Sequence, residues 1–344
     1  MIECIIKEIE TRVAYLKKKT INSIYFGGGT PSILNKKEVQ SILNTIYANF
    51  TVAEDIEITL ECNPDDLNSS KLVSLKKAGI NRLSIGIQSF NDTDLKFMNR
   101  SHNVKEALGC IHLARKAGFK NVTIDLIYGL PKQNNKKWKK NLEQILALDI
   151  QHFSAYALTV EPKTALKHLI DTKIIPPLKE EIIVEHFNTL VKFAAENNFI
   201  HYEISNFGKE GFFSNHNTAY WKNQHYIGIG PSAHSFNGDS RTWNISSNKK
   251  YIEGVLKKSI YSETEILTKK QKYHEYIITG LRTVGGVNLD YMGNQFGIDT
   301  QQYFEQQIQN WIAQEKVKKK SNNYTLTKKG KLYADAIASD LFIV

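Results

Sequence analysis

The sequence predicts an α/β protein whose main part is a partial TIM-type (β/α) barrel. From residue 21 to about residue 158, a short β-branched or aromatic run is followed by a break containing Gly, Pro, Asp or Asn and then by an amphipathic stretch. The runs end near residues 26, 62, 88, 129 and 158. They therefore recur about every 30 residues, which is the length of one βα unit and indicates parallel strands.

The strand runs also predict how the sheet is covered. Stretches such as ITL and IDLI are too continuously apolar for a sheet with one wet face. We therefore expect helices outside the sheet and packed side chains or a ligand inside it. Helices between the strands are predicted over residues 36–50, 69–78 and 104–117, and the last two end at Gly79 and Gly118.

The first predicted helix spans residues 1–18 and precedes every visible strand run. A βα barrel normally begins with a strand. We therefore expect that the first strand of the barrel is missing from this chain, and that the incomplete barrel occupies residues 1–240.

A different pattern follows residue 240. Helices are predicted over residues 248–258, 268–283 and 301–314, then a β-hairpin around Asn322 and Asn323, and a final helix over residues 328–342. Residues 241–344 are thus expected to form a mostly helical, winged-helix-like C-terminal domain. Such a module can bind nucleic acid, but no basic recognition helix is evident, so a packing or lid role is preferred.

The composition is that of an ordinary globular protein. The 344 residues are 41% hydrophobic and carry 45 Lys and Arg against 35 Asp and Glu, a formal charge of +10 with His neutral. The lysines are scattered, which favours a solvated surface over a nucleic-acid interface. No apolar run approaches the ~20 residues of a membrane-spanning helix, and the start lacks the pattern of a signal peptide. We expect a cytoplasmic protein without a membrane anchor.

Polar residues follow the predicted strands, where βα barrels carry their function. The run FGGGTPS allows a sharp turn with exposed backbone N–H groups, although a simple tight turn explains it equally well. Glu61 and Gln88 end strands, Asp125 lies within one, and Arg100 follows the third. Each alone could be a hydrogen-bonded core residue, but their recurrence on neighbouring strands favours a ligand site.

A second candidate site lies between residues 204 and 236, a segment rich in Gly, Phe and His. It is too irregular for a simple helix and is interpreted as a lid or a ligand platform. His216 with Tyr220 and Trp221 offers an iron-binding nitrogen beside flat aromatic surfaces, as a haem requires. A purely structural histidine is the alternative.

Several motifs occur together in a fixed order: GGGTPS, ECNPDD, LSIGIQSF, NVTIDLIYGLPKQ, and HNTAYW followed by GIGPSAHSF. In this combination the chain resembles, over essentially its whole length, the radical S-adenosylmethionine proteins related to oxygen-independent coproporphyrinogen III oxidase. The motif HNTAYW is similar to one associated with haem binding in the haem-chaperone branch of that family, and it argues against the oxidase branch.

The resemblance implies S-adenosylmethionine, a [4Fe–4S] cluster and haem as bound groups. For S-adenosylmethionine it implies Gly28, Gly29 and Thr30 at the methionine end, Glu61, Gln88, Arg100 and Asp125 at the amino, ribose and carboxylate groups, and Ala157 near the adenine. For haem it implies His216, Asn217, Tyr220 and Trp221, with His216 as a possible ligand of the iron.

One departure concerns the cluster. The family's Cys-x3-Cys-x2-Cys motif is absent, and Cys4, Cys62 and Cys110 are too far apart in the sequence to replace it or to suggest a disulfide framework. In the family this motif follows the first strand, upstream of the helix with which this chain begins. We therefore expect an N-terminally truncated sequence rather than a natural variant without a cluster.

The resemblance implies a haem chaperone that passes haem to an acceptor protein, such as a respiratory enzyme, without binding nucleic acid; homodimer formation is left open. The alternative is oxygen-independent oxidative decarboxylation of coproporphyrinogen III in porphyrin biosynthesis, an activity that we do not expect of this chain as it stands. A third possibility is a binding module in which residues 248–344 dock a partner.

Overall fold

The structure, a computed structural model, describes residues 1–16 and 20–343. It divides into two compact units. Unit 1 consists of Met1–Ser23, Lys37–Ile56 and Ser214–Val344, and unit 2 of Ile24–Lys36 and Glu57–Phe213. The domain boundary expected after residue 240 stays a prediction.

A curled, seven-stranded sheet with the order β1-β2-β3-β4-β5-β7-β6 forms the partial barrel that the sequence predicts. Its strands β2 to β5 pair in parallel, while β7 is antiparallel to both β5 and β6. The five predicted strands are confirmed, and the short antiparallel pair β6 and β7 is an addition. The strands are β1 (Thr20–Phe26), β2 (Thr51–Cys62), β3 (Arg82–Gln88), β4 (Asn121–Tyr128), β5 (His152–Ala157), β6 (Ile200–Glu203) and β7 (Asn206–Gly208).

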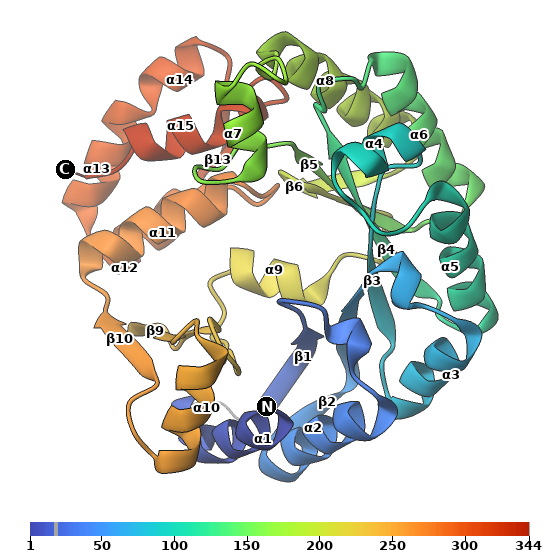
Figure 1. Cartoon of the computed structure of the whole chain (residues 1–344). Helices are drawn as coiled ribbons and strands as arrows, with labels where there is room; N and C mark the ends of the chain where they lie inside the picture. Colours follow the sequence, from blue (N-terminus) through green and yellow to red (C-terminus); the bar gives the residue numbers. More distant parts are fainter. Residues whose placement is uncertain (17–19, 344) are drawn as a thin grey trace. The chain divides into compact units, whose positions relative to one another are not determined.

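One face of this sheet is apolar. Ile85, Ile124 and Phe153 are cross-strand neighbours on β3, β4 and β5 and are fully buried. Helices of unit 2 run along the outside of these strands (Figure 1). They are α3 (Ser69–Ala78), α4 (Asp92–Phe97), α5 (Val104–Lys116), α6 (Asn135–Ala147) and α8 (Glu180–Glu196). The short helix α7 (Ala165–Asp171) belongs to the same unit and has no buried residue.

The opposite face of the sheet, where packed side chains or a ligand are expected, carries polar side chains. Every second residue is a polar one, as in Thr123 and Asp125 of β4 or His152 and Ser154 of β5. These side chains bond to one another, since Ser84 donates to Asp125 at 3.4 Å. Polar and apolar residues therefore alternate along these strands, and only the apolar side chains enter the core beneath the helices.

Local capping explains why the helices begin and end where they do. The Asn68 side chain accepts a hydrogen bond from the backbone N–H of Lys71, and Gly79 ends α3 in the left-handed conformation at φ 112°. A capping box between Asn103 and Glu106 opens α5. The predicted helix over residues 36–50 is α2 (Lys36–Asn49), so all three predicted helices between strands are confirmed.

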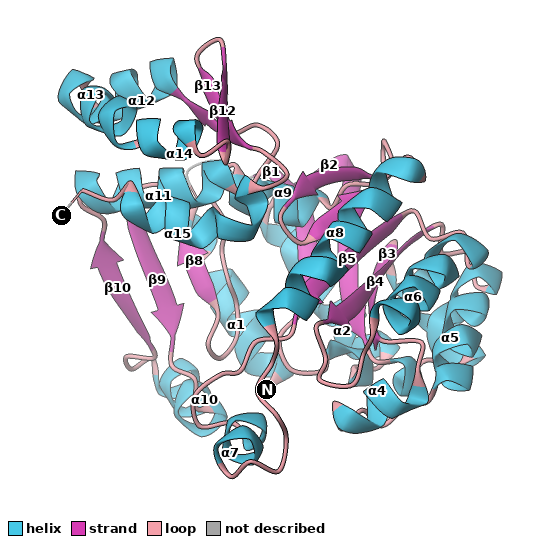
Figure 2. Ribbon diagram, turned by 90° about the horizontal axis from the view of Figure 1, so that it is seen from above, coloured by secondary structure: helices cyan, strands magenta, loops and turns pink. Residues whose placement is uncertain are grey.

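Unit 1 contains an antiparallel sheet of β8 (His234–Phe236), β9 (Ser240–Asn244) and β10 (Ser262–Ile266), seen side by side in Figure 2. Two helices of the same unit, α1 (Ile2–Thr11) and α10 (Asn248–Lys257), pack through Cys4, Tyr251 and Val255. The predicted helix over residues 1–18 is shorter than expected: α1 is followed by a 3-10 turn at Val13–Tyr15, and residues 17–19 lie outside the described part. A further short helix, α9 (Asn215–Trp221), lies within the irregular segment.

The C-terminal part of unit 1 has the helices and the hairpin that the sequence predicts, although the helix expected over residues 301–314 is interrupted. A third short strand, β11, joins the hairpin in a sheet of order β11-β13-β12. Of the described residues, none forms a helix long and apolar enough to cross a membrane. The elements are α11 (Lys269–Leu281), β11 (Val287–Asn288), α12 (Leu289–Phe296), α13 (Ile298–Gln307), α14 (Gln309–Ala313), β12 (Val317–Lys320), β13 (Asn323–Leu326) and α15 (Ala334–Asp340).

A buried carboxylate ties the separate stretches of unit 1 together. Glu8 on α1 is fully buried. Its Oε2 accepts hydrogen bonds from the Tyr251 hydroxyl at 2.6 Å and from the Gly230 N–H at 2.8 Å. Its Oε1 accepts from Asn244 Nδ2 at 2.7 Å and from Arg12 Nη1 at 3.1 Å. Each acceptor site of the charge is thus matched by a donor, which is the condition for burying a carboxylate.

Replacing Glu8 tests this network. Glu8→Ala removes the carboxylate that balances the Arg12 charge and takes an acceptor from the Tyr251 hydroxyl and the Gly230 N–H. We therefore expect the free energy of unfolding to fall by about 3–5 kcal/mol. Glu10→Ala, at an exposed position of the same helix, should change it by less than about 0.5 kcal/mol. Urea unfolding of both variants checks this, and equal losses would contradict a special role for Glu8.

Candidate functional site

The first part of the site is the turn after β1. Gly28 and Gly29 have φ angles of 72° and 71°, a left-handed conformation that favours glycine, and both are exposed. Glu61 lies beside this turn: its Oε1 accepts a hydrogen bond from the Tyr25 hydroxyl at 2.6 Å and its Oε2 from the Gly28 N–H at 3.3 Å. A Cβ on Gly27 would lie 2.6 Å from the Tyr25 ring. The turn therefore requires glycines, and the Gly28 N–H joins it to Glu61.

The second part lies at the end of β3. Gln88 has a φ of 65° at an irregularity in the pairing of β3 with β4, which re-aims its side chain. Arg100 Nη2 donates to Asn63 Oδ1 at 2.9 Å and to the Gly86 carbonyl at 3.3 Å. A Cβ on Gly86 would lie 2.9 Å from Gln88 Nε2 and 3.3 Å from Arg100 Nη2. Gln88 and Arg100 therefore meet over Gly86.

A buried hydrogen-bond network fixes the loop that carries Gln88. Asp94 Oδ2 accepts from the Ser89 hydroxyl at 2.9 Å and from Gln133 Nε2 at 3.1 Å. Asn141 Oδ1 accepts from the Phe90 N–H at 2.8 Å. All four polar side chains of this network are almost fully buried. The residues after Gln88 are therefore held rigidly, and the left-handed conformation of Gln88 is fixed with them.

The third part is Asp125, in the middle of β4 and beside Ser84 of β3. Burial raises the pKa of this carboxyl to about 6, the hydrogen bond from Ser154 opposes the rise, and the charge of Glu61 adds to it. Burial likewise raises the pKa of Tyr25 well above its usual value, with Glu61 contributing. The neighbouring acids thus share one electrostatic environment on the polar face.

The residues expected to hold S-adenosylmethionine all lie in unit 2. Glu61 contacts the glycine turn, Gln88 meets Arg100, and Asp125 lies on the next strand, while Ala157 ends β5 opposite Tyr128. Thr30 is exposed and directly precedes the 3-10 turn Pro31–Ile33. The predicted set does not include Tyr25, Asn63, Ser84 and Ser154, which bond to the predicted residues. The alternation of polar side chains along β3 and β5 is the pattern that indicates Ser84 and Ser154.

The cysteines do not fit an iron–sulfur cluster. Cys4 lies on α1, Cys62 ends β2 and Cys110 lies on α5, and all three are buried. Burial raises the pKa of Cys110 to about 12 and that of Cys62 well above its usual value, whereas a cluster requires thiolates. Among the described residues, no group of His, Cys, Asp and Glu could hold a metal ion. The surroundings of Gly27 and Gly86, by contrast, fit S-adenosylmethionine. A side chain at either position would fill the space beside Glu61 or Gln88 that the ligand needs.

The motif HNTAYW forms α9 in unit 1. Ser214 caps the helix by accepting from the Asn217 N–H at 3.2 Å. His216 Nδ1 lies 3.1 Å from the Ser23 hydroxyl, and its ring meets Tyr220 edge to face with 4.9 Å between the centroids. Trp221 carries the Arg282 guanidinium over its rings, at 5.3 Å. The four predicted haem-site residues thus share one short helix with an aromatic and cationic environment.

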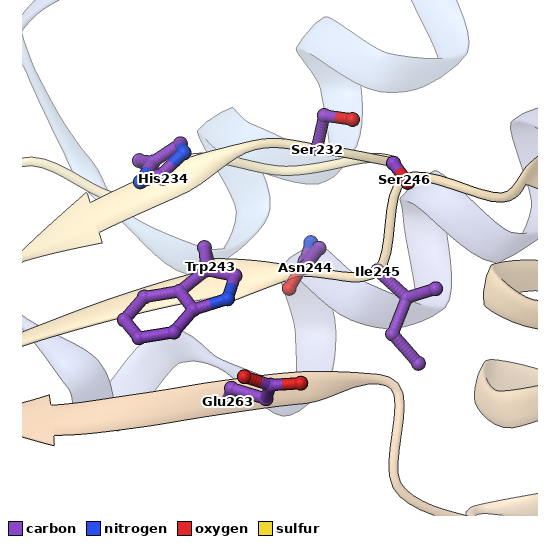
Figure 3. Close-up of a pocket in the computed structure, with 7 residues that line it drawn as sticks. All are labelled: Ser232, His234, Trp243, Asn244, Ile245, Ser246 and Glu263. Atoms are coloured by element: carbon purple, nitrogen blue, oxygen red, sulfur yellow. The ribbon is translucent and has the colours of Figure 1, made fainter.

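A pocket of about 350 Å³ lies on the three-stranded sheet of unit 1 (Figure 3). His234, Trp243 and Glu263 are cross-strand neighbours on β8, β9 and β10 and form one row along it. His234 and Trp243 stack with 6.3 Å between their centroids. His234 belongs to the motif GIGPSAHSF, but sequence reasoning assigned it no role.

The raised pKa of Asp125 predicts a pH-dependent stability. A carboxyl with a folded-state pKa of about 6, above its unfolded value, stabilises the fold while protonated and loses that contribution as the pH rises through about 6. Between pH 4 and pH 7 the wild type should therefore lose up to about 3 kcal/mol of unfolding free energy relative to Asp125→Asn, which has no carboxyl group at this position. Urea unfolding at both pH values measures it, and parallel curves would refute the assignment.

Comparisons with known proteins identify the superfamily and the fold. Residues 5–145 match the Radical SAM superfamily, and residues 267–333 match the HemN C-terminal domain. The solved structure of coproporphyrinogen III oxidase (HemN) from Escherichia coli is similar with a TM-score of 0.83 over 99% of this chain and 82% of that one, at 22% identity, which shows the fold alone.

Sequence relatives are more specific. The heme chaperone HemW of Bacillus subtilis is 32% identical over 335 residues, which are 96% of this chain and 88% of that protein. The heme chaperone HemW of Lactococcus lactis is 31% identical over 329 residues, 96% of this chain and 86% of the relative. Both alignments span nearly the whole of either protein. The chain therefore belongs to the HemW family of the radical SAM superfamily.

Proposed function

We propose that this protein binds haem through α9 and delivers it to an acceptor protein. The observation that carries this proposal is the setting of His216, whose Nδ1 is engaged by Ser23 while its ring meets Tyr220. A hydrogen bond to one ring nitrogen orients a histidine for iron binding through the other. The name of its relatives, heme chaperone, supports delivery as the purpose of binding.

The proposal includes S-adenosylmethionine in unit 2. Gly28, Gly29 and Thr30 would hold its methionine end, and Ala157 would lie near its adenine. When bound, this cofactor would supply the sulfonium chemistry of the superfamily. The protein's own part is to present backbone N–H groups and to keep the acids in place. The residues assigned to its amino, ribose and carboxylate groups are Glu61, Gln88, Arg100 and Asp125.

The site of action follows from the same proposal. A haem-delivering protein of this family would act in the cytoplasm, with haem and the accepting protein as its partners. A respiratory enzyme is one acceptor of suitable chemistry, because such enzymes take up haem as a prosthetic group.

Haem titration tests the role of His216. Wild-type protein should give a shifted Soret band on binding haem, and His216→Ala should lose the shift and bind at least about tenfold more weakly, because the iron loses its nitrogen ligand. His112→Ala, at an exposed position on α5, is the matched control and should behave as the wild type. Indistinguishable spectra and affinities of wild type and His216→Ala would refute the ligand assignment.

Equilibrium dialysis tests the cofactor site. Glu61→Gln removes the charge that faces the glycine turn, so S-adenosylmethionine should bind about tenfold more weakly than to the wild type. Glu54→Gln changes an exposed acid of the same strand, β2, and should leave the affinity unchanged. Equal affinities of the wild type and Glu61→Gln would remove Glu61 from the site.

A further inference from the structure

Three polar atoms around α9 are buried and have no hydrogen-bond partner in the described part of the chain: Thr218 Oγ1, Trp221 Nε1 and Arg282 Nε. Thr218 and Trp221 are three residues apart and share one side of α9. The guanidinium carbon of Arg282 lies 5.3 Å from the centre of the Trp221 rings. Buried polar groups are nearly always hydrogen-bonded, so this concentration of unsatisfied atoms indicates a place where a ligand completes the bonding.

The position of Arg282 is fixed by the helix that carries it. Asn223, just after α9, donates through Nδ2 to Thr279 Oγ1 of α11 at 3.4 Å. Thr279 and Arg282 are three residues apart and therefore lie on the same side of α11. The contact that attaches the end of α9 to α11 thus also brings Arg282 to Trp221.

The guanidinium of Arg282 is only partly used. Its Nη1 donates to Asp335 Oδ1 at 2.8 Å, but the Asp335 side chain is 85% exposed while that of Arg282 is 22% exposed. Asp335 therefore occupies Nη1, while Nε has no partner in the described part of the chain. Nε and Nη2 donate along the same edge of the guanidinium, so this edge offers a fork that one carboxylate can occupy with both oxygens.

We propose that Arg282, together with Trp221 Nε1, binds a carboxylate of the ligand, and that this carboxylate is a propionate group of haem. The inference rests on the proposed function. Haem combines a flat apolar ring with carboxylate arms, and unit 1 offers the matching combination: Tyr220 and Tyr226 contact each other with 4.5 Å between their centroids, and the fork of Arg282 lies beside the same helix. The incoming carboxylate binds the edge formed by Nε and Nη2 and so satisfies Nε, while Asp335 keeps its contact with Nη1.

The carboxylate site is tested first without haem. In protein labelled with ¹⁵N-tryptophan, sodium propionate should shift the indole N–H resonance of Trp221, identified by its loss in Trp221→Phe, whereas sodium chloride at equal ionic strength should not. Arg282→Gln should abolish the shift. Lys272→Gln is the matched control. It removes a positive charge of α11 that pairs with Asp239, so it should preserve the shift. No shift in the wild type would overturn the inference.

The identity of the carboxylate is tested with haem and with its dimethyl ester, whose propionates are masked. Arg282→Gln should weaken the binding of haem about tenfold and that of the ester less than twofold, while Lys272→Gln should change neither. Equal effects of Arg282→Gln on both ligands, or none on either, would overturn the assignment to propionate. If the wild type shows the propionate shift but binds no haem, the carboxylate site stands and the proposed function fails.

Discussion

The pleat of the seven-stranded sheet is the constraint on which the candidate cofactor site depends. Successive side chains point to opposite faces, so Ile124 enters the core while Asp125 turns to the polar face. Because β2 to β5 are parallel and in register, polar side chains arrive in rows, such as Asp125 beside Ser154. A slip of one residue would exchange the two faces and remove both the core and the site.

Burial shifts the protonation of several groups on this polar face. Burial lowers the pKa of His152 well below its usual value, so the ring stays neutral between Thr123 and Tyr202, to which its two nitrogens are hydrogen-bonded. Burial acts in the opposite direction on the acid, by raising the pKa of Asp125. The two charges of the Arg82–Glu57 pair balance each other in the interior. Glu61, by contrast, lies at the end of its strand beside an exposed glycine turn.

The parts of the fold that depend on local chemistry could be predicted from the sequence. Caps such as Asn68 and Gly79 act within one helical turn, and the Gly, Pro and Asn breaks end each strand where it was expected. The pairing of β6 and β7 with β5 could not be predicted, because these strands are only a few residues long and their partner is distant in sequence. The apolar residues of ITL and IDLI stand close together in the sequence, so these runs do not indicate that one face of the sheet is polar. The partners of Asp125 on that face are therefore not evident from these runs. The partners of Glu61, by contrast, include Tyr25 from a different strand, which no local pattern reveals.

The network around Glu8 also determines the order in which the protein can form. The partners of this carboxylate lie 222, 236 and 243 residues farther along the chain. Unit 2, by contrast, is nearly one continuous stretch and is complete at Phe213. During synthesis, α1 emerges before unit 2, yet its carboxylate must wait for Tyr251 before all of its hydrogen bonds are made. Unit 1 is therefore the slow unit of high contact order, and α1 stays without these distant partners while unit 2 is being completed.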